Sequence, residues 1–301
     1  MQEAEVMGDG GGPDFPSSTP EYSCIVGLGD SMIDDGNLVR AAEDFAPDFG
    51  PVMPDYHHNN MTNGPVIVEY LANHLGLDVP SPSLLGGTNY AYGAAMTSSD
   101  THLTEDQSER YNAPANLPIP STQTQVNEYI SKGVDPNALH VISTGGNDFL
   151  PLYLDERPPP LDIFETEIPR IVNQLIEAGA RHIIVLRLSL ENIIPPRMKA
   201  MPDEMRSILL KQMREFSALI LPLDNLPEVY VYDVTGFGKA VLENPTALGF
   251  ENITDACIST DDSADQDTFL FWDQVHLTTK AHAILAEDIH RVINGLESSF
   301  N

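Results

Sequence analysis

Short apolar runs alternate along the chain with longer segments in which apolar residues recur at helical spacing. Four runs have the length of buried strands, at 23–28, 139–143, 182–188 and 228–234. A shorter run at 89–91 is a fifth candidate strand. Strands that alternate with helices in this way are typical of a parallel sheet covered by helices on both faces.

The helical segments carry recognisable start and stop signals. From Ile168 to Ile176 the apolar residues recur at i, i+3, i+4, i+7 and i+8, and Gly179 follows as a stop signal. The same reasoning predicts four further helices, at 65–75, 122–131, 203–219 and 279–296. We therefore predict a three-layer α/β/α sandwich with a mainly parallel, five-stranded sheet in flavodoxin-like order.

The N-terminal segment lies outside this alternation. Residues 1–22 contain a glycine-rich run at 8–13, which is typical of a flexible tether after a removed signal or lipid anchor. We expect a disordered tether at 1–22 and a single domain at 23–301. This organisation favours a secreted, periplasmic or cell-surface protein, with a cytoplasmic protein as the alternative.

Two long polar stretches, at 43–63 and 98–120, also resist assignment to strands or helices. Insertions at the carboxyl ends of parallel strands tend to form the rim of the ligand crevice. Their aromatic and thioether side chains suit an adaptable apolar wall, and mobile surface loops are the alternative. The predicted rim residues are Met53, Tyr56, Met61 and Tyr111.

Acidic residues outnumber basic ones by 45 to 15, and the formal net charge is −30 at pH 7. This charge repels nucleic acids and anionic membrane surfaces at long range, so we expect no nucleic-acid partner. It suits a protein kept soluble at high salt and equally an ordinary acidic secreted protein. The longest apolar runs are far shorter than the roughly 20 residues of a transmembrane helix, so no membrane span is predicted.

The two cysteines are too few for a disulfide scaffold. Cys24 lies within the first predicted strand, where a buried free thiol is common, and Cys257 is far away in sequence. We expect two free thiols.

Three residues supply the roles of an activated oxygen nucleophile. Ser31 follows the first strand and precedes a helix-like segment, a position that exposes its hydroxyl beside unpaired backbone N–H groups. Far downstream, Asp273 and His276 stand three residues apart before the last predicted helix. The histidine can accept the serine proton and the carboxylate can orient the histidine. Taken singly, each motif is equally well explained as a turn or a helix start.

Two further segments reach the same edge of the predicted sheet. Asn147 follows the strand at 139–143, and its side-chain amide can donate a hydrogen bond to a developing oxyanion. Gly93 follows the run at 89–91, and its lack of a side chain lets a backbone N–H approach closely. Read alone, the first is a turn and the second a point of close packing.

Other catalytic patterns are missing from the sequence. It contains no Gly-x-Ser-x-Gly elbow, and none of the five lysines follows a serine by three residues. His57, His58 and the acidic run at 261–267 match neither His-Glu-x-x-His nor a glycine-bearing calcium loop. We therefore predict neither a catalytic metal nor another cofactor.

Together, the blocks around Ser31, Gly93, Asn147 and His276 resemble the GDSL family of SGNH hydrolases over about residues 23–296. Within that family the chain is similar to the branch of bacterial phospholipase/lecithinase/hemolysin-type esterases and plant GDSL lipases. The further segments that carry this similarity are Asp34-Asp35-Gly36-Asn37, Thr62-Asn63-Gly64-Pro65, Val68-Glu69-Tyr70-Leu71, Asn244-Pro245 and Gly249-Phe250-Glu251-Asn252.

The resemblance implies a role for each site residue. Ser31 is the nucleophile, His276 the base and Asp273 its partner, while Gly93, Asn147 and the Ser31 backbone N–H bind the oxyanion. Two departures from the family pattern are modest: Met32 replaces a leucine, and Ala94 stands where a second glycine is common.

The implied fold is the SGNH hydrolase fold, and the implied activity is that of a serine carboxylesterase or lipase. Its partner is a small-molecule or lipid ester, hydrolysed through an acyl-serine intermediate: an acyl, lipid or phospholipid ester. Three alternatives remain: acyl transfer to an alcohol, carbohydrate deacetylation, and an inactive surface or adhesion module. The sequence predicts no particular oligomeric state.

Overall fold

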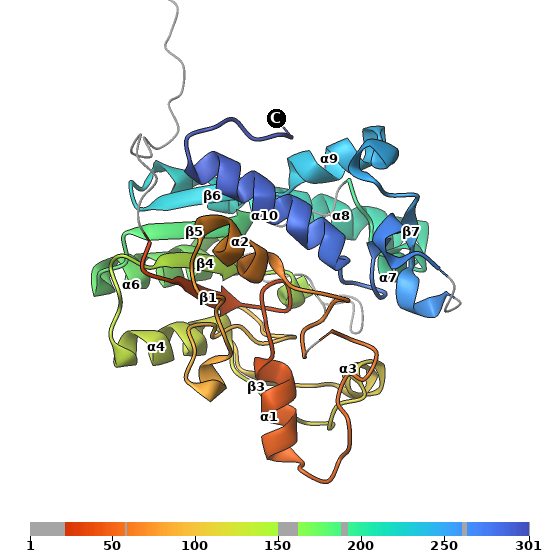
Figure 1. Cartoon of the computed structure of the whole chain (residues 1–301), viewed down its shortest axis with the longest axis horizontal. Coiled ribbons are helices and arrows are strands. Elements are labelled where there is room, and N and C mark those ends of the chain that lie inside the picture. Colours follow the sequence, from red (N-terminus) through yellow and green to blue (C-terminus); the bar gives the residue numbers. More distant parts are fainter. Residues whose placement is uncertain (1–21, 58, 150–161, 188–191, 261–263, 301) are drawn as a thin grey trace, which may run out of the picture.

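The computed structural model describes residues 22–57, 59–149, 162–187, 192–260 and 264–300. Its central sheet has four parallel strands (Figure 1). Their order across the sheet is β1 (Ile25–Gly29), β4 (Leu139–Ser143), β5 (His182–Arg187) and β6 (Val229–Asp233). All three neighbouring pairs are parallel, as the alternation of strands and helices predicts.

The predicted fifth strand is reduced to a single bridge. Asn89 pairs with Gly27 of β1 in parallel orientation, which gives this segment the outer place that flavodoxin-like order assigns to it. The ladder stops there because the Gly29 N–H donates to the Gln125 side chain at 2.7 Å instead of continuing the strand pairing. The expectation of five regular strands is therefore corrected to four strands and one bridged segment.

Helices surround the sheet and extend beyond its edge. The described helices are α1 (Asn37–Phe45), α2 (Ile67–Leu75), α3 (Glu105–Tyr111), α4 (Thr122–Lys132), α6 (Ile168–Ala178), α7 (Pro196–Lys199), α8 (Asp203–Ser217), α9 (Thr235–Glu243) and α10 (Thr279–Ile293). Two small sheets pair β2 (Thr101–His102) with β3 (Pro118–Ile119), antiparallel, and β7 (Asn252–Ala256) with β8 (Phe269–Phe271), parallel. The five predicted helices agree with the structure to within three residues at each end.

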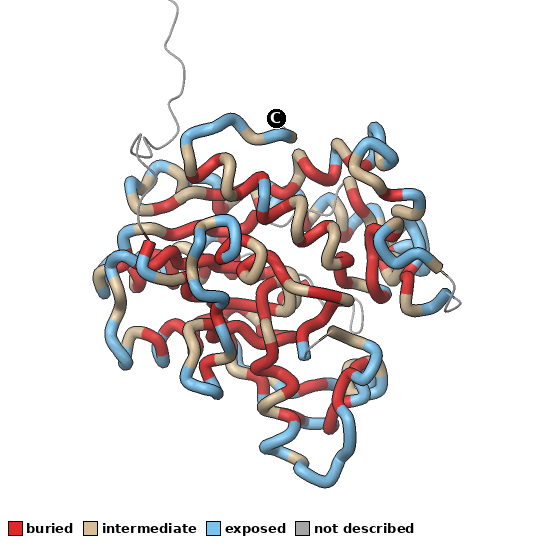
Figure 2. The backbone as a smooth tube through the Cα atoms, in the orientation of Figure 1, coloured by how far each residue is buried: buried red, intermediate tan, exposed pale blue. Residues whose placement is uncertain are grey.

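Two hydrophobic clusters lie on the two faces of the central sheet. One packs α2, α9 and α10 against the sheet, and the other packs α4, α6 and α8. Along β5, Ile184 and Leu186 belong to the first cluster, whereas Ile183 and Val185 belong to the second. Successive strand side chains point to opposite faces, so a strand covered on both sides is apolar throughout. The strands are accordingly buried (Figure 2), and the three-layer α/β/α prediction is confirmed.

The two polar insertions fold around a third hydrophobic cluster, which includes Leu38, Met53, Met61 and Leu103. It joins α1 and α3. The sequence predicts a helix directly after Ser31, but α1 begins only at Asn37, and the apolar spacing does not predict α3. The helix α3 begins with a capping box between Thr104 and Gln107, which satisfies otherwise unpaired backbone N–H groups. The buried parts of these stretches are therefore packed next to the sheet (Figure 1), whereas residues 43–51 are mostly exposed.

The predicted tether falls almost wholly outside the described residues. Its last residue, Tyr22, is an exception: it is buried and packs edge-on against His182, with ring centroids 5.2 Å apart. Tyr22 therefore belongs to the packed part of the chain, and the boundary between tether and domain stays a prediction. Cys24 and Cys257 are free thiols, as predicted.

Two features are absent from the described ranges. No helix in them is long and apolar enough to cross a membrane. No group of three or more His, Cys, Asp or Glu side chains among them is arranged to hold a metal ion.

Candidate active site

Ser31 lies in a tight turn directly after β1. Gly29 has φ +139°, and a Cβ there would lie 1.8 Å from the Ser143 carbonyl oxygen, so this turn requires glycine. Asp30 Oδ1 accepts hydrogen bonds from the Ser143 hydroxyl at 2.8 Å and from the Met32 N–H at 3.2 Å. Burial raises the pKa of Asp30 to about 6 against the opposing effect of these bonds. The turn is thus tied to the end of β4 and presents Ser31 at the carboxyl edge of the sheet.

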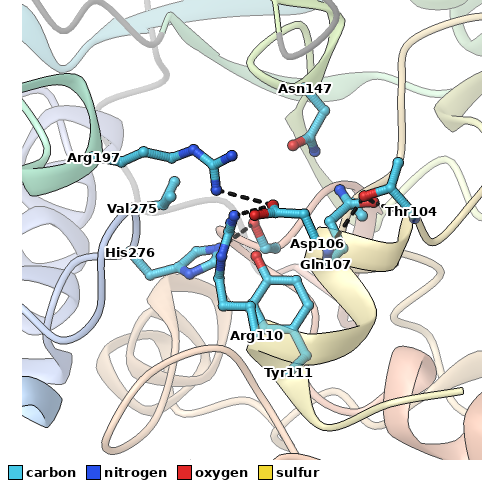
Figure 3. Close-up of a pocket in the computed structure, with 11 residues that line it drawn as sticks. Thr104, Asp106, Gln107, Arg110, Tyr111, Asn147, Arg197, Val275 and His276 are labelled. Carbon is cyan, nitrogen blue, oxygen red and sulfur yellow. Dashed lines mark hydrogen bonds and ion pairs between the residues drawn. The ribbon is translucent and has the colours of Figure 1, made fainter. Parts of the chain in front are cut away.

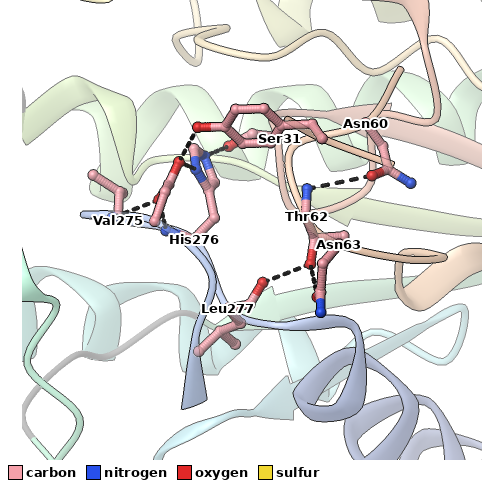
Figure 4. Close-up of polar contacts among 9 residues, drawn as sticks. Ser31, Asn60, Thr62, Asn63, Val275, His276 and Leu277 are labelled. Atoms are coloured by element: carbon pink, nitrogen blue, oxygen red, sulfur yellow. Dashed lines mark hydrogen bonds and ion pairs between the residues drawn. The ribbon is translucent and has the colours of Figure 1, made fainter. Parts of the chain in front are cut away.

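Ser31, His276 and Asp273 form one hydrogen-bonded chain (Figure 4). Ser31 Oγ lies 2.9 Å from His276 Nε2, and His276 Nδ1 lies 2.8 Å from Asp273 Oδ2. The histidine and the aspartate are buried, whereas the serine is half-buried and faces a cavity. A nucleophile, a base and an orienting carboxylate at these distances have the geometry needed to activate the serine hydroxyl.

Four hydrogen bonds hold the Asp273 carboxylate. Oδ1 accepts the backbone N–H groups of Val275 at 2.7 Å and His276 at 2.6 Å. Oδ2 accepts His276 Nδ1–H and, at 2.9 Å, the hydroxyl of Tyr56. Burial acts to raise the pKa of Asp273, but the charge of His276 and the hydrogen bonds from His276 and Val275 lower it to about 2. The carboxylate therefore stays ionised at neutral pH and fixes the orientation of the imidazole.

The loop that carries His276 is held by the segment Thr62-Asn63-Gly64. Thr62 Oγ1 donates to the Leu277 carbonyl oxygen at 2.8 Å (Figure 4), and Asn63 Oδ1 accepts the Thr279 N–H at 2.9 Å. A Cβ on Gly64 would lie 2.4 Å from Thr279 Oγ1, so glycine permits this close approach. This segment therefore positions the histidine loop from outside the cavity.

Asn147 lies where the sequence places it, at the start of the 3₁₀ turn η2 (Asn147–Phe149) that follows β4. Its side chain lines the same cavity as Ser31. One Nδ2 hydrogen donates to the Ala95 carbonyl oxygen at 2.9 Å, which orients the amide and leaves the second hydrogen for a ligand. The Ser31 backbone N–H is also free of any partner among the residues described.

The structure corrects the role expected of Gly93. Its backbone N–H donates to Asp34 Oδ2 at 2.7 Å, so it is not available to an oxyanion. Ala94 instead lines the cavity beside Ser31, with φ +65°, and its N–H has no partner in the described part of the chain. The resemblance drawn from the sequence expects a second glycine at this position, and the chain has alanine there. The sequence therefore predicts Gly93 as the backbone donor, whereas the next residue, Ala94, lines the cavity.

The segment after Ser31 is hydrogen-bonded to the segment around Gly93. Besides Gly93, the buried Asp34 carboxylate accepts the Asn37 N–H at 2.8 Å at the start of α1. Asn37 Nδ2 in turn donates to the Asn89 carbonyl oxygen at 2.7 Å. Next to them, burial and the Asp34 charge raise the pKa of Asp35 to about 8. These side chains anchor the backbone around the site and do not face its cavity.

The cavity above Ser31 has a volume of about 50 Å³ (Figure 3). Of the four predicted rim residues, only Tyr111 lines it, with its ring centroid 6.1 Å from that of His276. Tyr56 lies against Asp273, and Met53 and Met61 are buried in the third hydrophobic cluster. These three do not line the cavity, because the insertions use their apolar side chains to pack among themselves.

Several residues that line the cavity were not predicted from the sequence. They are Ala94, Thr104, Asp106, Gln107, Arg110, Arg197 and Val275. The capping box of α3 was a detectable signal for the first half of that helix. Nothing local marked Arg197, because α7 reaches the cavity only through the tertiary fold.

The fold and the Ser–His–Asp chain are typical of an SGNH-type hydrolase. The model of the GDSL-like lipase/acylhydrolase family matches residues 25–289, and the chain belongs to this family.

Individual relatives are distant. GDSL esterase/lipase At4g26790 of Arabidopsis thaliana is 23% identical over 333 residues, with 91% of this chain and 92% of the relative covered. Thermolabile hemolysin of Vibrio parahaemolyticus is 24% identical, with 92% and 64% covered. The crystal structure of the acetylxylan esterase Axe2 from Geobacillus stearothermophilus aligns with a TM-score of 0.46 and 18% identity, covering 91% of this chain and 95% of Axe2.

Proposed function

We propose that this protein hydrolyses carboxylic esters through an acyl intermediate on Ser31. The observation that carries the proposal is the hydrogen-bonded chain from Ser31 Oγ through His276 to Asp273, which opens on a cavity. Membership of an esterase/lipase family supports it.

In the proposed reaction, Ser31 Oγ attacks the ester carbonyl carbon while His276 Nε2 accepts the hydroxyl proton. The carbonyl oxygen becomes an oxyanion, for which the donors are the Ser31 and Ala94 N–H groups and Asn147 Nδ2. The bond to the alcohol then breaks, and the alcohol leaves with the proton from His276. A water molecule attacks the acyl-enzyme, His276 accepts its proton, and the acid is released as Ser31 Oγ recovers the proton.

The size of the cavity favours a short acyl group. The space of about 50 Å³ next to Ser31 corresponds to a few water-sized groups, which supports acetyl to butyryl as the acyl groups held there. An acetyl group on a larger alcohol, such as a carbohydrate, is the alternative that the same cavity accommodates.

Hydrolysis rates for p-nitrophenyl esters from acetyl to palmitoyl test the proposal. We expect kcat/KM to be highest for the short esters, and a fluorophosphonate probe to label Ser31. A protein that neither hydrolyses any of these esters nor reacts with the probe would not be an ester hydrolase. A maximum at palmitoyl would instead show that the cavity opens for long chains.

Replacing Tyr56 by phenylalanine is expected to change the pH dependence of the reaction. The change removes one of the two donors to Asp273 Oδ2 and keeps the ring, which packs edge-on against Trp272 and Tyr111. Asp273 Oδ2 then keeps the His276 side chain as its donor, so its negative charge is shared less and interacts more strongly with the imidazole. A hydrogen bond worth about 0.5–1.5 kcal/mol corresponds to roughly 0.5 to 1 pH unit. The low-pH limb of the kcat/KM profile should move up by that amount.

The matched control is Tyr129→Phe, which removes a buried hydroxyl bonded to His140 at 3.0 Å and away from the cavity. Its profile should coincide with that of the parent. A Tyr56→Phe profile that stays in place, or moves to lower pH, would contradict the role assigned to this hydroxyl.

A further inference from the structure

Two arginines from opposite sides of the cavity converge on one carboxylate (Figure 3). Arg110 belongs to α3 and Arg197 to α7, and both guanidinium groups contact Asp106 Oδ2, Arg197 at 3.1 Å. The Arg197 backbone N–H donates to the Gln274 carbonyl oxygen at 3.0 Å, which ties α7 to the loop of His276. The pair is thus fixed beside the reacting groups.

The charge of the cavity lining is opposite to that of the chain. Overall, 45 acidic residues face 15 basic ones, but the lining residues include two arginines and a single carboxylate. Among the lining side chains the two guanidinium groups outnumber the single carboxylate, and the ionised Asp273 carboxylate lies behind the lining against His276. The arginine side chains are only 16% and 26% exposed, so solvent and salt screen their charge less than that of an open surface pair.

Asp106 does not use up the donors of the two guanidinium groups. A guanidinium carries five N–H donors, and the Arg197 side chain gives one to Asp106 and makes no other hydrogen bond within the described ranges. Planar guanidinium groups suit carboxylate and phosphate oxygens, which they bind in pairs of hydrogen bonds. Both arginines line the cavity, and the Arg110 guanidinium also lies over the Tyr111 ring, 5.6 Å from its centroid. Positive charge at the cavity opposes the repulsion that an acidic chain exerts on an anion.

We propose that Arg110 and Arg197 bind an anionic group of the substrate, so that the preferred ester carries a carboxylate or phosphate close to the bond that is cleaved. This inference rests on the proposed function, because it names the substrate class of the same site. The anionic group belongs either to the acyl part or to the alcohol part of the ester, and the two sources require separate substrates.

Two matched pairs of esters separate these sources. The first pair differs at the end of the acyl part, where monomethyl succinate has a carboxylate and methyl butyrate has a methyl group. Acid release is followed by titration. The second pair differs on the alcohol part, where 4-acetoxybenzoate has a carboxylate and 4-tolyl acetate has a methyl group. The variants are Arg110→Gln and Arg197→Gln. The control is Arg170→Gln, which removes a guanidinium that pairs with Glu167 and does not line the cavity.

We expect the parent to prefer the anionic member of at least one pair. Each cavity variant should lower kcat/KM for that member by about 10- to 100-fold, the range expected for losing hydrogen bonds to a charged group. The neutral member should change by less than about 2-fold, and the control should alter neither. If kcat/KM falls equally for both members of a pair, the arginines only hold α3 and α7 together, and the inference is wrong. A parent that prefers neither anionic ester also overturns it.

Binding separates this inference from the proposed function. Calorimetric titration of the Ser31→Ala protein with monomethyl succinate and with 4-acetoxybenzoate reports anion binding without turnover. Suppose that the parent hydrolyses no ester, that Ser31→Ala binds the anionic esters, and that Ser31→Ala/Arg197→Gln does not bind them. The anion site would then be supported and the proposed ester hydrolysis would be wrong. If the parent hydrolyses neutral esters and Ser31→Ala binds neither anionic ester, the proposed function stands and the anion site is wrong.

Discussion

Replacing Ser31 by alanine is expected to lower kcat for p-nitrophenyl acetate by about 10³-fold or more while the fold survives. The change removes the attacking oxygen and the hydrogen bond to His276 Nε2. The turn itself is held by the backbone of Gly29 and by the Asp30 carboxylate, neither of which the substitution alters. The Tm should therefore stay within a few degrees of that of the parent.

Three measurements check this result: kcat, Tm, and the site of fluorophosphonate labelling by peptide mapping. Ser207→Ala on α8 is the matched control, since this exposed serine only donates to the Asp203 carbonyl oxygen on its own helix. It should keep both turnover and labelling. Labelling of another serine in the parent, or full activity without the Ser31 hydroxyl, would remove Ser31 from the proposed reaction.

Replacing Asn147 by alanine is expected to lower kcat by about 10²- to 10³-fold, which corresponds to about 2.7–4 kcal/mol of lost transition-state stabilisation. The amide lines the cavity with Ser31 and Ala94, and its bond to the Ala95 carbonyl oxygen holds it in place. An oxyanion donor acts mainly in the transition state. The loss should therefore appear in kcat more than in KM.

The competing explanation is that Asn147 only stabilises the turn after β4. In that case the substitution would lower the Tm and leave kcat per folded molecule unchanged. Asn127→Ala is a suitable control, because this exposed asparagine on α4 accepts a hydrogen bond from Gln123 and does not line the cavity. Equal kcat losses in the two variants would indicate a general effect of the substitution.

The regular elements were predictable because their patterns are local. The strands at 139–143 and 182–187 are buried on both faces, so they are continuous apolar runs in the sequence. The helix at 168–178 has an apolar stripe and ends at Gly179, which adopts the left-handed conformation of a helix C-cap. Ser31, Asn147 and His276 were predictable for a related reason: each lies in a short motif next to such an element.

The insertions were not predictable in the same way. Met53 and Met61 lie in segments with no regular apolar spacing, and they are buried by contacts between α1, α3 and the loops around them. Gly93 and Ala94 are neighbours in sequence, and only their contacts decide between them. The Gly93 N–H donates to Asp34, whereas Ala94 faces the cavity.

The sequence by itself determined the α/β layering, the four regular strands and the short motifs that contain Ser31, Asp273 and His276, because hydrophobic spacing and short motifs depend on neighbours within a few residues. Only the tertiary structure decided which backbone N–H faces the cavity, that Tyr56 contacts Asp273, and that two arginines meet at Asp106. Residues 106 and 197 are 91 positions apart. Contacts over such separations depend on how the elements pack in three dimensions, which no local pattern of residues records.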